Sequence, residues 1–121
     1  MSVKPAGPER MFFLADQSLL WPEFMDIQHW REQIDAIDDE LVKLINQRAV
    51  FVAEIARLKQ MAQLPVHIPE REAQIHARIR TTNPGPLRAD ALQRIFECII
   101  CESRQLEHQI LEEADSSASH R

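Results

Sequence analysis

The 121-residue chain is poor in glycine and aromatic residues, with two glycines and 6% aromatic side chains. It also has few stretches in which β-branched residues alternate with polar ones, as they do in strands. Long stretches rich in Ala, Leu, Glu, Gln and Arg favour helix instead. The sequence therefore predicts one all-α domain of three helices, one long and two shorter.

Several classes of function are disfavoured by what is missing. The net charge is −5, and no basic face with interleaved aromatic residues appears, so a nucleic-acid binder is not expected. No apolar window reaches transmembrane length, and the N-terminal region lacks the apolar core of a signal peptide, which predicts a cytoplasmic protein. Cys98 and Cys101 fall inside a helical pattern without further Cys or His partners. We expect two buried or half-buried thiols and no metal site.

Prolines divide the chain into segments. Residues 1–25 are expected to form an irregular N-terminal extension, 26–113 the helical domain, and 114–121 a Ser-rich, disordered tail. The long helix should run from about residue 26 to about residue 63, and the second should begin at Pro69. The Asn-Pro-Gly-Pro stretch at 83–86 breaks the pattern again, so the third helix should cover about 88–113.

The long helix carries an apolar heptad repeat over five repeats. Its two core positions are occupied by Ile27, Ile34, Leu41, Arg48, Ile55 and Ala62, and by Trp30, Ile37, Leu44, Phe51 and Leu58. Such a helix is about 55 Å long, and two shorter helices of the same chain cannot cover it. We therefore expect an intertwined helical homodimer, in which two long helices lie antiparallel.

Arg48 interrupts this repeat at a position that should be dry, and Arg31 and Lys59 flank the same seam. A buried cation is costly unless an anion meets it. Arg48 could form a structural ion pair with Glu72 or bind an acidic ligand. Lys59 could instead extend its ammonium group into water from the end of the helix.

The two shorter helices also carry polar residues in their inner stripes. Glu72, next to Arg71, interrupts the second helix, and Ser103, followed by Glu107, interrupts the third. Ser103 could donate a hydrogen bond to a backbone carbonyl of its own helix, and Glu107 could be a carboxylate exposed to water. Taken together, the cations outnumber the two carboxylates, which favours a site for a small dicarboxylate.

The ordered set of motifs resembles the all-helical chorismate mutases. The resemblance covers about residues 27–112 and is closest to the mutase domains fused to prephenate dehydratase. It is carried by the strings Arg31-Glu32-Gln33-Ile34-Asp35-Ala36-Ile37-Asp38, Asn46-Gln47-Arg48, Ala56-Arg57-Leu58-Lys59, Pro65-Val66, Pro69-Glu70-Arg71-Glu72, Asn83-Pro84-Gly85-Pro86-Leu87 and Ile95-Phe96, leading to Ser103.

This resemblance implies the intertwined dimer and the conversion of chorismate to prephenate in aromatic amino-acid biosynthesis, on the shikimate pathway. The reaction is a unimolecular Claisen rearrangement that uses no metal and no organic cofactor. By position, Arg48 and the partner subunit's Arg31 would grip the two carboxylates, with help from Ser103 and Arg71. Lys59 would donate to the ether oxygen, and Glu72 would accept from the ring hydroxyl.

Two positions depart from the pattern of many relatives. Ile68 stands where many members carry Asp, and the main-chain N–H at this position is the group expected to touch the ring hydroxyl. Glu107 stands where many carry Gln as a second donor to the ether oxygen. Because an ionised carboxylate cannot donate, Glu107 would need a proton to fill this role.

Four alternatives stay open from the sequence. Isochorismate–pyruvate lyases share the fold and take a substrate with nearly the same charges, and a mutase for the amino analogue of chorismate would suit Glu72 equally. A helical dimerisation module without chemistry would need no excess of cations. The fourth is a mutase that depends on a partner enzyme of aromatic biosynthesis. The N-terminal extension could then be a docking segment for that partner, or it could pack on its own dimer or be mobile.

Overall fold

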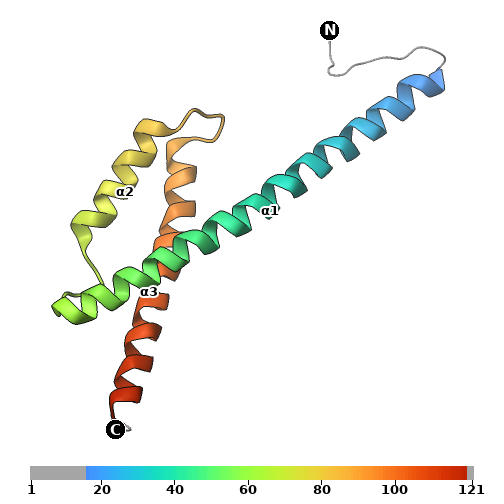
Figure 1. Ribbon diagram of the computed structural model, residues 1–121. Helices are drawn as coiled ribbons and strands as arrows, with labels where there is room; N and C mark the ends of the chain where they lie inside the picture. Colours follow the sequence, from blue (N-terminus) through green and yellow to red (C-terminus); the bar gives the residue numbers. More distant parts are fainter. Residues whose placement is uncertain (1–15, 120–121) are drawn as a thin grey trace. The chain divides into compact units, whose positions relative to one another are not determined.

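The computed structural model describes the backbone of residues 16–119 and the side chains of residues 26–119. Within that range the chain forms three helices and no strand, namely α1 (Asp16–Ala62), α2 (Pro69–Thr82) and α3 (Ala89–Ser119) (Figure 1). The predicted all-α chain with one long and two shorter helices is confirmed. The chain divides into two units between Lys43 and Leu44, and the second unit contains the end of α1 together with α2 and α3.

α1 begins about ten residues before the predicted start, so residues 16–25 are helical where an irregular extension was expected. Pro22 caused the error, because an isolated proline usually marks a break. A proline this close to a helix start removes one early backbone hydrogen bond, and Gln17, Leu19 and Leu20 before it are good helix formers. The rest of the predicted extension, residues 1–15, lies outside the described residues.

α1 ends in a Schellman motif. The Gln63 N–H donates to the Gln60 carbonyl at 3.2 Å, and the Leu64 N–H donates to the Lys59 carbonyl at 2.8 Å. Gln63 has φ 58°, the left-handed conformation that this motif requires and that glycine usually supplies. The motif stops the helix one turn after Lys59 and turns the chain toward α2. α2 begins at Pro69 as predicted, with Glu70 and Glu72 in its first turn.

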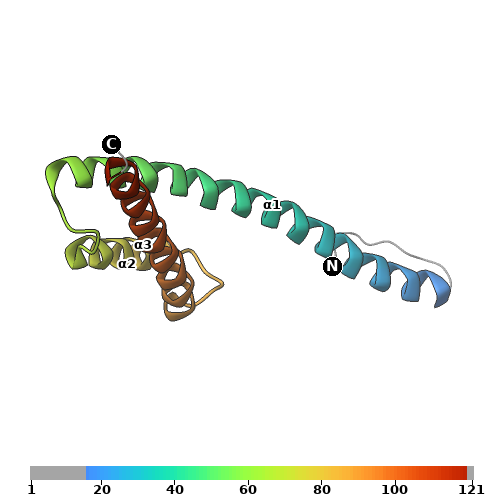
Figure 2. The same cartoon turned by 90° about the horizontal axis from the view of Figure 1, so that it is seen from below.

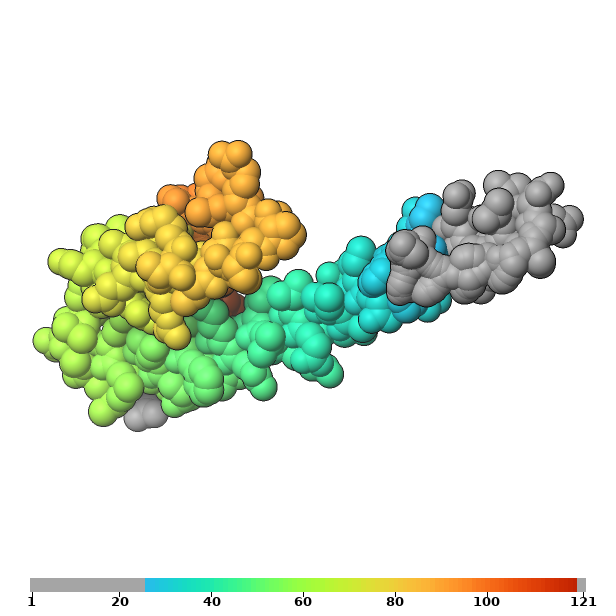
Figure 3. All heavy atoms as spheres, turned by 90° about the horizontal axis from the view of Figure 1, so that it is seen from above, coloured from blue at the N-terminus to red at the C-terminus, as the bar shows by residue number. Residues whose placement is uncertain are grey.

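α2 and α3 pack side by side (Figures 1 and 2). The predicted inner positions are half-buried on both helices: Ile68, Glu72, Ile75 and Ile79 at α2, and Leu92, Phe96, Ile99, Ser103, Leu106 and Ile110 on α3. The Asn83 side chain closes the connection by accepting from the Gly85 N–H and donating to the Leu87 carbonyl. Figure 3 shows the atoms of α2 and of the turn after it, in yellow and orange, beside those of the last turns of α1, in green.

α3 continues to Ser119, six residues past its predicted end, so most of the segment expected to be a disordered tail is helical. No proline or glycine follows Pro86 in the sequence, so nothing in that stretch breaks the helix. The expected burial of the two thiols is also wrong, since Cys98 and Cys101 are exposed. Both lie off the inner stripe of α3.

The large apolar side chains of the heptad repeat on α1 are exposed. Their exposed fractions run from 47% for Ile55 to 68% for Phe51, and the set comprises Ile27, Trp30, Ile34, Ile37, Leu41, Leu44, Phe51, Ile55 and Leu58. By contrast, Ala56 on the same helix is fully buried. The seam predicted from the repeat thus has no cover within the described part of the single chain. Among the helices described, none has the length and apolar character needed to cross a membrane.

Replacement of Gln63 by glycine is expected to raise the free energy of unfolding by about 1 kcal/mol, because glycine adopts φ 58° without the steric cost that a side chain carries. Chemical denaturation measures the change. Gln60→Gly is the matched control and should lower stability by about 1 kcal/mol, since Gln60 lies within the helix. Loss of stability in both variants would contradict the role given to Gln63.

Candidate active site

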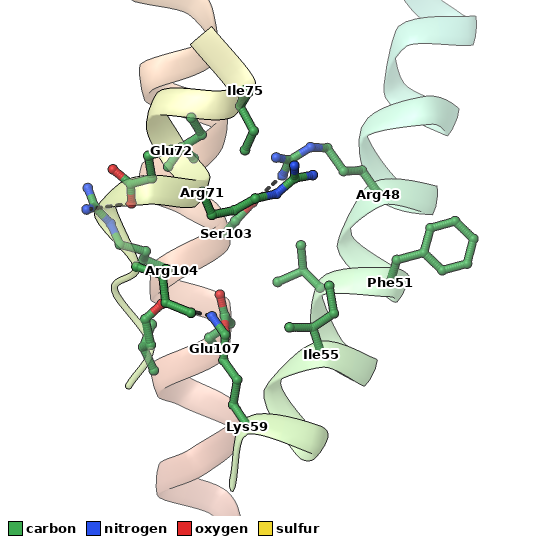
Figure 4. A pocket seen from close by; sticks show the side chains of 14 residues that line it. Arg48, Phe51, Ile55, Lys59, Arg71, Glu72, Ile75, Ser103, Arg104 and Glu107 are labelled. Atoms are coloured by element: carbon green, nitrogen blue, oxygen red, sulfur yellow. Dashed lines mark hydrogen bonds and ion pairs between the residues drawn. The ribbon is translucent and has the colours of Figure 1, made fainter. Parts of the chain in front are cut away.

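The second unit contains a cavity of about 540 Å³ between the end of α1, α2 and α3 (Figure 4). This volume lies in the range of small-molecule binding sites. Most of the wall is apolar, and six charged side chains and one hydroxyl converge on it. The lining residues are Arg48, Phe51, Val52, Ile55, Lys59, Val66, Ile68, Arg71, Glu72, Ile75, Ile100, Ser103, Arg104 and Glu107.

Arg48 reaches from α1 toward α3, where its Nη1 donates to the Ser103 Oγ at 2.7 Å (Figure 4). Ser103 in turn donates to the Ile99 carbonyl at 2.9 Å, so its hydroxyl is held in place from its own helix. The predicted back-bond of Ser103 is therefore present, and it exists alongside the contact with Arg48.

No ion pair joins Arg48 to Glu72 in the described residues. The charged group that acts on the pKa of Arg48 is instead another cation. Burial lowers the pKa of the Arg48 guanidinium, and the positive charge of Arg71 lowers that pKa further. Two guanidinium groups at the edge of a cavity repel each other, and a carboxylate of a ligand placed between them would attract both.

Lys59 and Glu107 form a buried ion pair. The Lys59 Nζ lies 2.8 Å from Glu107 Oε2, and the side chains are 13% and 8% exposed. The same ammonium group donates to the Val66 carbonyl at 2.9 Å. An ammonium group has three N–H bonds, so one is left to point at a ligand in the cavity that both residues line. Glu107 is thus a buried partner of Lys59, and the alternative of a solvated carboxylate is wrong.

Glu72 on α2 contacts an arginine and a histidine. The Arg104 Nη1 donates to Glu72 Oε2 at 3.1 Å, and the His67 Nε2 lies 3.5 Å from the same oxygen. Arg104 was missed in the sequence, although a signal was present. Ile100, Ser103, Arg104 and Glu107 follow the i, i+3, i+4, i+7 spacing of one helix face.

The structure brings together most of the predicted site residues. Those that line the cavity are Arg48, Lys59, Ile68, Arg71, Glu72, Ser103 and Glu107. Arg31 does not line it; this residue is exposed on α1, in the unit that ends at Lys43. The lining contains four cations, counting Arg104, against two carboxylates, and that excess of positive charge suits a small dianion.

The side chains of α1, α2 and α3 are thus arranged around one cationic, largely apolar cavity. The sequence model of the chorismate mutase type II family matches residues 30–108, which include every lining residue. The chain belongs to this family.

Relatives of the chain include separate and fused members of the family. A chorismate mutase from Methanocaldococcus jannaschii is 32% identical over 87 residues, which are 71% of this chain and 88% of the relative. A bifunctional chorismate mutase/prephenate dehydratase from Aquifex aeolicus is 36% identical over 89 residues, 70% of this chain. The chain spans about a quarter of the length of such bifunctional relatives.

Solved structures show the same fold. A chorismate mutase from Thermus thermophilus matches with a TM-score of 0.68 and 32% identity, over 69% of this chain and 94% of the other. A chorismate mutase from Helicobacter pylori in complex with prephenate matches with a TM-score of 0.67 and 29% identity, over 72% and 94%. Within the described residues, no cluster of His, Cys, Asp and Glu is placed to hold a metal ion.

Proposed function

We propose that this chain is a chorismate mutase that converts chorismate to prephenate. The observation that carries the proposal is the cavity in which Arg48 and Arg71 face each other while the Lys59 ammonium group lies on the same wall. Chorismate carries two carboxylates and an ether oxygen. The two guanidinium groups can donate to carboxylate, and the ammonium group can donate to the ether oxygen. The family and its separate relative from Methanocaldococcus jannaschii support the assignment.

In the proposed reaction the protein forms no covalent bond to the substrate. The ether C–O bond breaks while a C–C bond forms in one concerted step, so the enzyme acts by holding the reactive conformation and by stabilising charge. Arg48, with Ser103 and Arg71, binds carboxylate. A substrate carboxylate also relieves the repulsion between the two guanidinium groups, which offsets the cost of removing Arg48 from water.

Lys59 supplies the charge stabilisation in this mechanism. As the ether bond breaks, negative charge grows on its oxygen, and a preorganised ammonium group favours that state over the ground state. Its bonds to Val66 and Glu107 hold the ammonium group before substrate arrives. Glu107 reaches the same region and would donate to the ether oxygen in its protonated form. Glu72 would accept from the ring hydroxyl, and the Ile68 main-chain N–H would contact the same hydroxyl.

We also propose that the working form is an intertwined homodimer in which Arg31 of the partner subunit completes the site. The exposed apolar residues of the heptad repeat support this assembly, because a seam of this size on a single chain needs a partner. The cytoplasmic location and a partner enzyme of aromatic biosynthesis stay predictions; the bifunctional relatives join a mutase to prephenate dehydratase in one chain.

The first experiment offers chorismate and isochorismate separately to the purified chain and identifies the products by NMR. Prephenate from chorismate is expected.

Arg48→Ala should lower kcat/KM by about a hundredfold or more, with an unchanged or raised melting temperature because a buried cation is removed. The exposed Arg57, which pairs with Glu54, is the control, and Arg57→Ala should keep its activity. Salicylate and pyruvate from isochorismate would assign a lyase instead, and no turnover would leave a binding module.

Glu107→Gln is expected to keep or raise kcat/KM for chorismate, because an amide N–H donates to the ether oxygen and an ionised carboxylate cannot. Glu107→Ala supplies no donor and should lower kcat/KM. Assays of both variants with chorismate make the measurement. A loss in Glu107→Gln as large as the loss in Glu107→Ala would remove Glu107 from the proposed donor role.

The dimer is tested by mixing two inactive variants, Arg31→Ala and Arg48→Ala, unfolding them together and refolding them. If Arg31 serves the partner's site, each mixed dimer regains one intact site, and roughly a quarter of wild-type activity should return by random pairing. Each variant refolded alone is the control. A dimer in sedimentation with no recovered activity would place Arg31 in its own subunit's site, and a monomer would refute the assembly.

A further inference from the structure

Arg104 joins α3 to a carboxylate at the cavity that has a proposed role in binding substrate. Its Nη1 lies 3.1 Å from Glu72 Oε2, and the side chains of Arg104 and Glu72 are 34% and 25% exposed. Both residues line the cavity. In the close view, the Glu72 carboxylate turns toward the guanidinium of Arg104 (Figure 4). This contact involves two elements that are more than thirty residues apart in the sequence, so it is a tertiary feature.

The contacts to Glu72 are uneven between its two oxygens. Arg104 and His67 both approach Oε2, whereas the described residues offer Oε1 no hydrogen bond or ion pair. A carboxylate oxygen without a protein donor keeps its capacity to accept from a ligand. The pair therefore fixes one oxygen of Glu72 and leaves the other available.

A free glutamate side chain samples several rotamers, and ordering it on ligand binding costs on the order of 1 kcal/mol or more. The ion pair with Arg104 places that cost in folding, before the ligand arrives. The guanidinium suits this purpose, because its planar set of donors holds a carboxylate in a defined orientation.

We propose that Arg104 is a positioning residue that holds Glu72 so that its free oxygen accepts the hydrogen bond from the ring hydroxyl of the substrate. This inference rests on the proposed mutase function. Arg104 thus contributes to recognition of the ring hydroxyl through its contact with Glu72. This task is separate from the binding of the substrate carboxylates by Arg48 and Arg71.

Three explanations of Arg104 make different predictions. A positioning residue matters only when the substrate carries the ring hydroxyl. A residue that merely adds positive charge to the cavity affects every dianionic substrate equally. A merely structural residue lowers the melting temperature, with no dependence on the hydroxyl.

The test compares Arg104→Met and Arg104→Lys with chorismate and with its 4-deoxy analogue as substrates. Arg104→Met should lower kcat/KM for chorismate by about tenfold, in keeping with a weakened hydrogen bond to a charged group. The change for the analogue should stay below about twofold on the same scale. Arg104→Lys should restore part of the loss, because an ammonium group supplies the charge without the planar fork.

Arg94→Met is the matched control, since Arg94 is an exposed arginine of the same helix that pairs with Asp90. It should leave both substrates unaffected. In a Glu72→Gln background, Arg104→Met should add little, because the two residues act as one unit. An additive double variant, or an equal loss with both substrates, would overturn the positioning role while the mutase function stands. A wild-type chain that converts neither substrate would overturn the proposed function and this inference with it.

Discussion

One turn of α3, from Ser103 to Glu107, connects the parts of the site. Ser103 receives Arg48, Arg104 binds Glu72, and Glu107 binds Lys59. Two of these partners come from α1 and one from α2. Because side chains at i and i+4 of a helix lie one turn apart on the same face, and the side chain at i+1 projects beside them, a single rigid turn sets the relative positions of all three contacts. The cavity keeps its shape only while this turn remains helical and half-buried.

The site combines two electrostatic solutions. Lys59 and Glu72 each have a partner of opposite charge within the protein, which offsets the cost of removing them from water. Arg48 and Arg71 are both cations and repel each other, and among the described residues no carboxylate pairs with Arg48. Burial lowers the pKa of Arg48. An anion bound between the two guanidinium groups would relieve this repulsion. The arrangement supports the proposed binding of a substrate carboxylate at this place.

Much of the chain follows from local rules that operate along the sequence. The breaks at Pro69 and at 83–86 were predictable, as were the inner faces of α2 and α3, because proline and helical period act over a few residues. The same rules failed at Pro22, where good helix formers outweighed one missing hydrogen bond, and at the tail, which was judged by its serines. The burial predicted for Cys98 and Cys101 was wrong because it followed the usual burial of cysteine, and not the inner stripe of α3, which excludes both.

The sequence by itself determined the helical class, the apolar repeat of α1 and most of the charged and polar residues at the cavity, because periodicity and charge can be read without coordinates. Only the tertiary structure decided which charged groups meet. Glu72 had several cations within plausible reach, and it pairs with Arg104 and His67, while Arg48 goes to a serine hydroxyl. Pairing depends on the distances and angles between packed helices, to within about an ångström. No pattern along one helix contains that information.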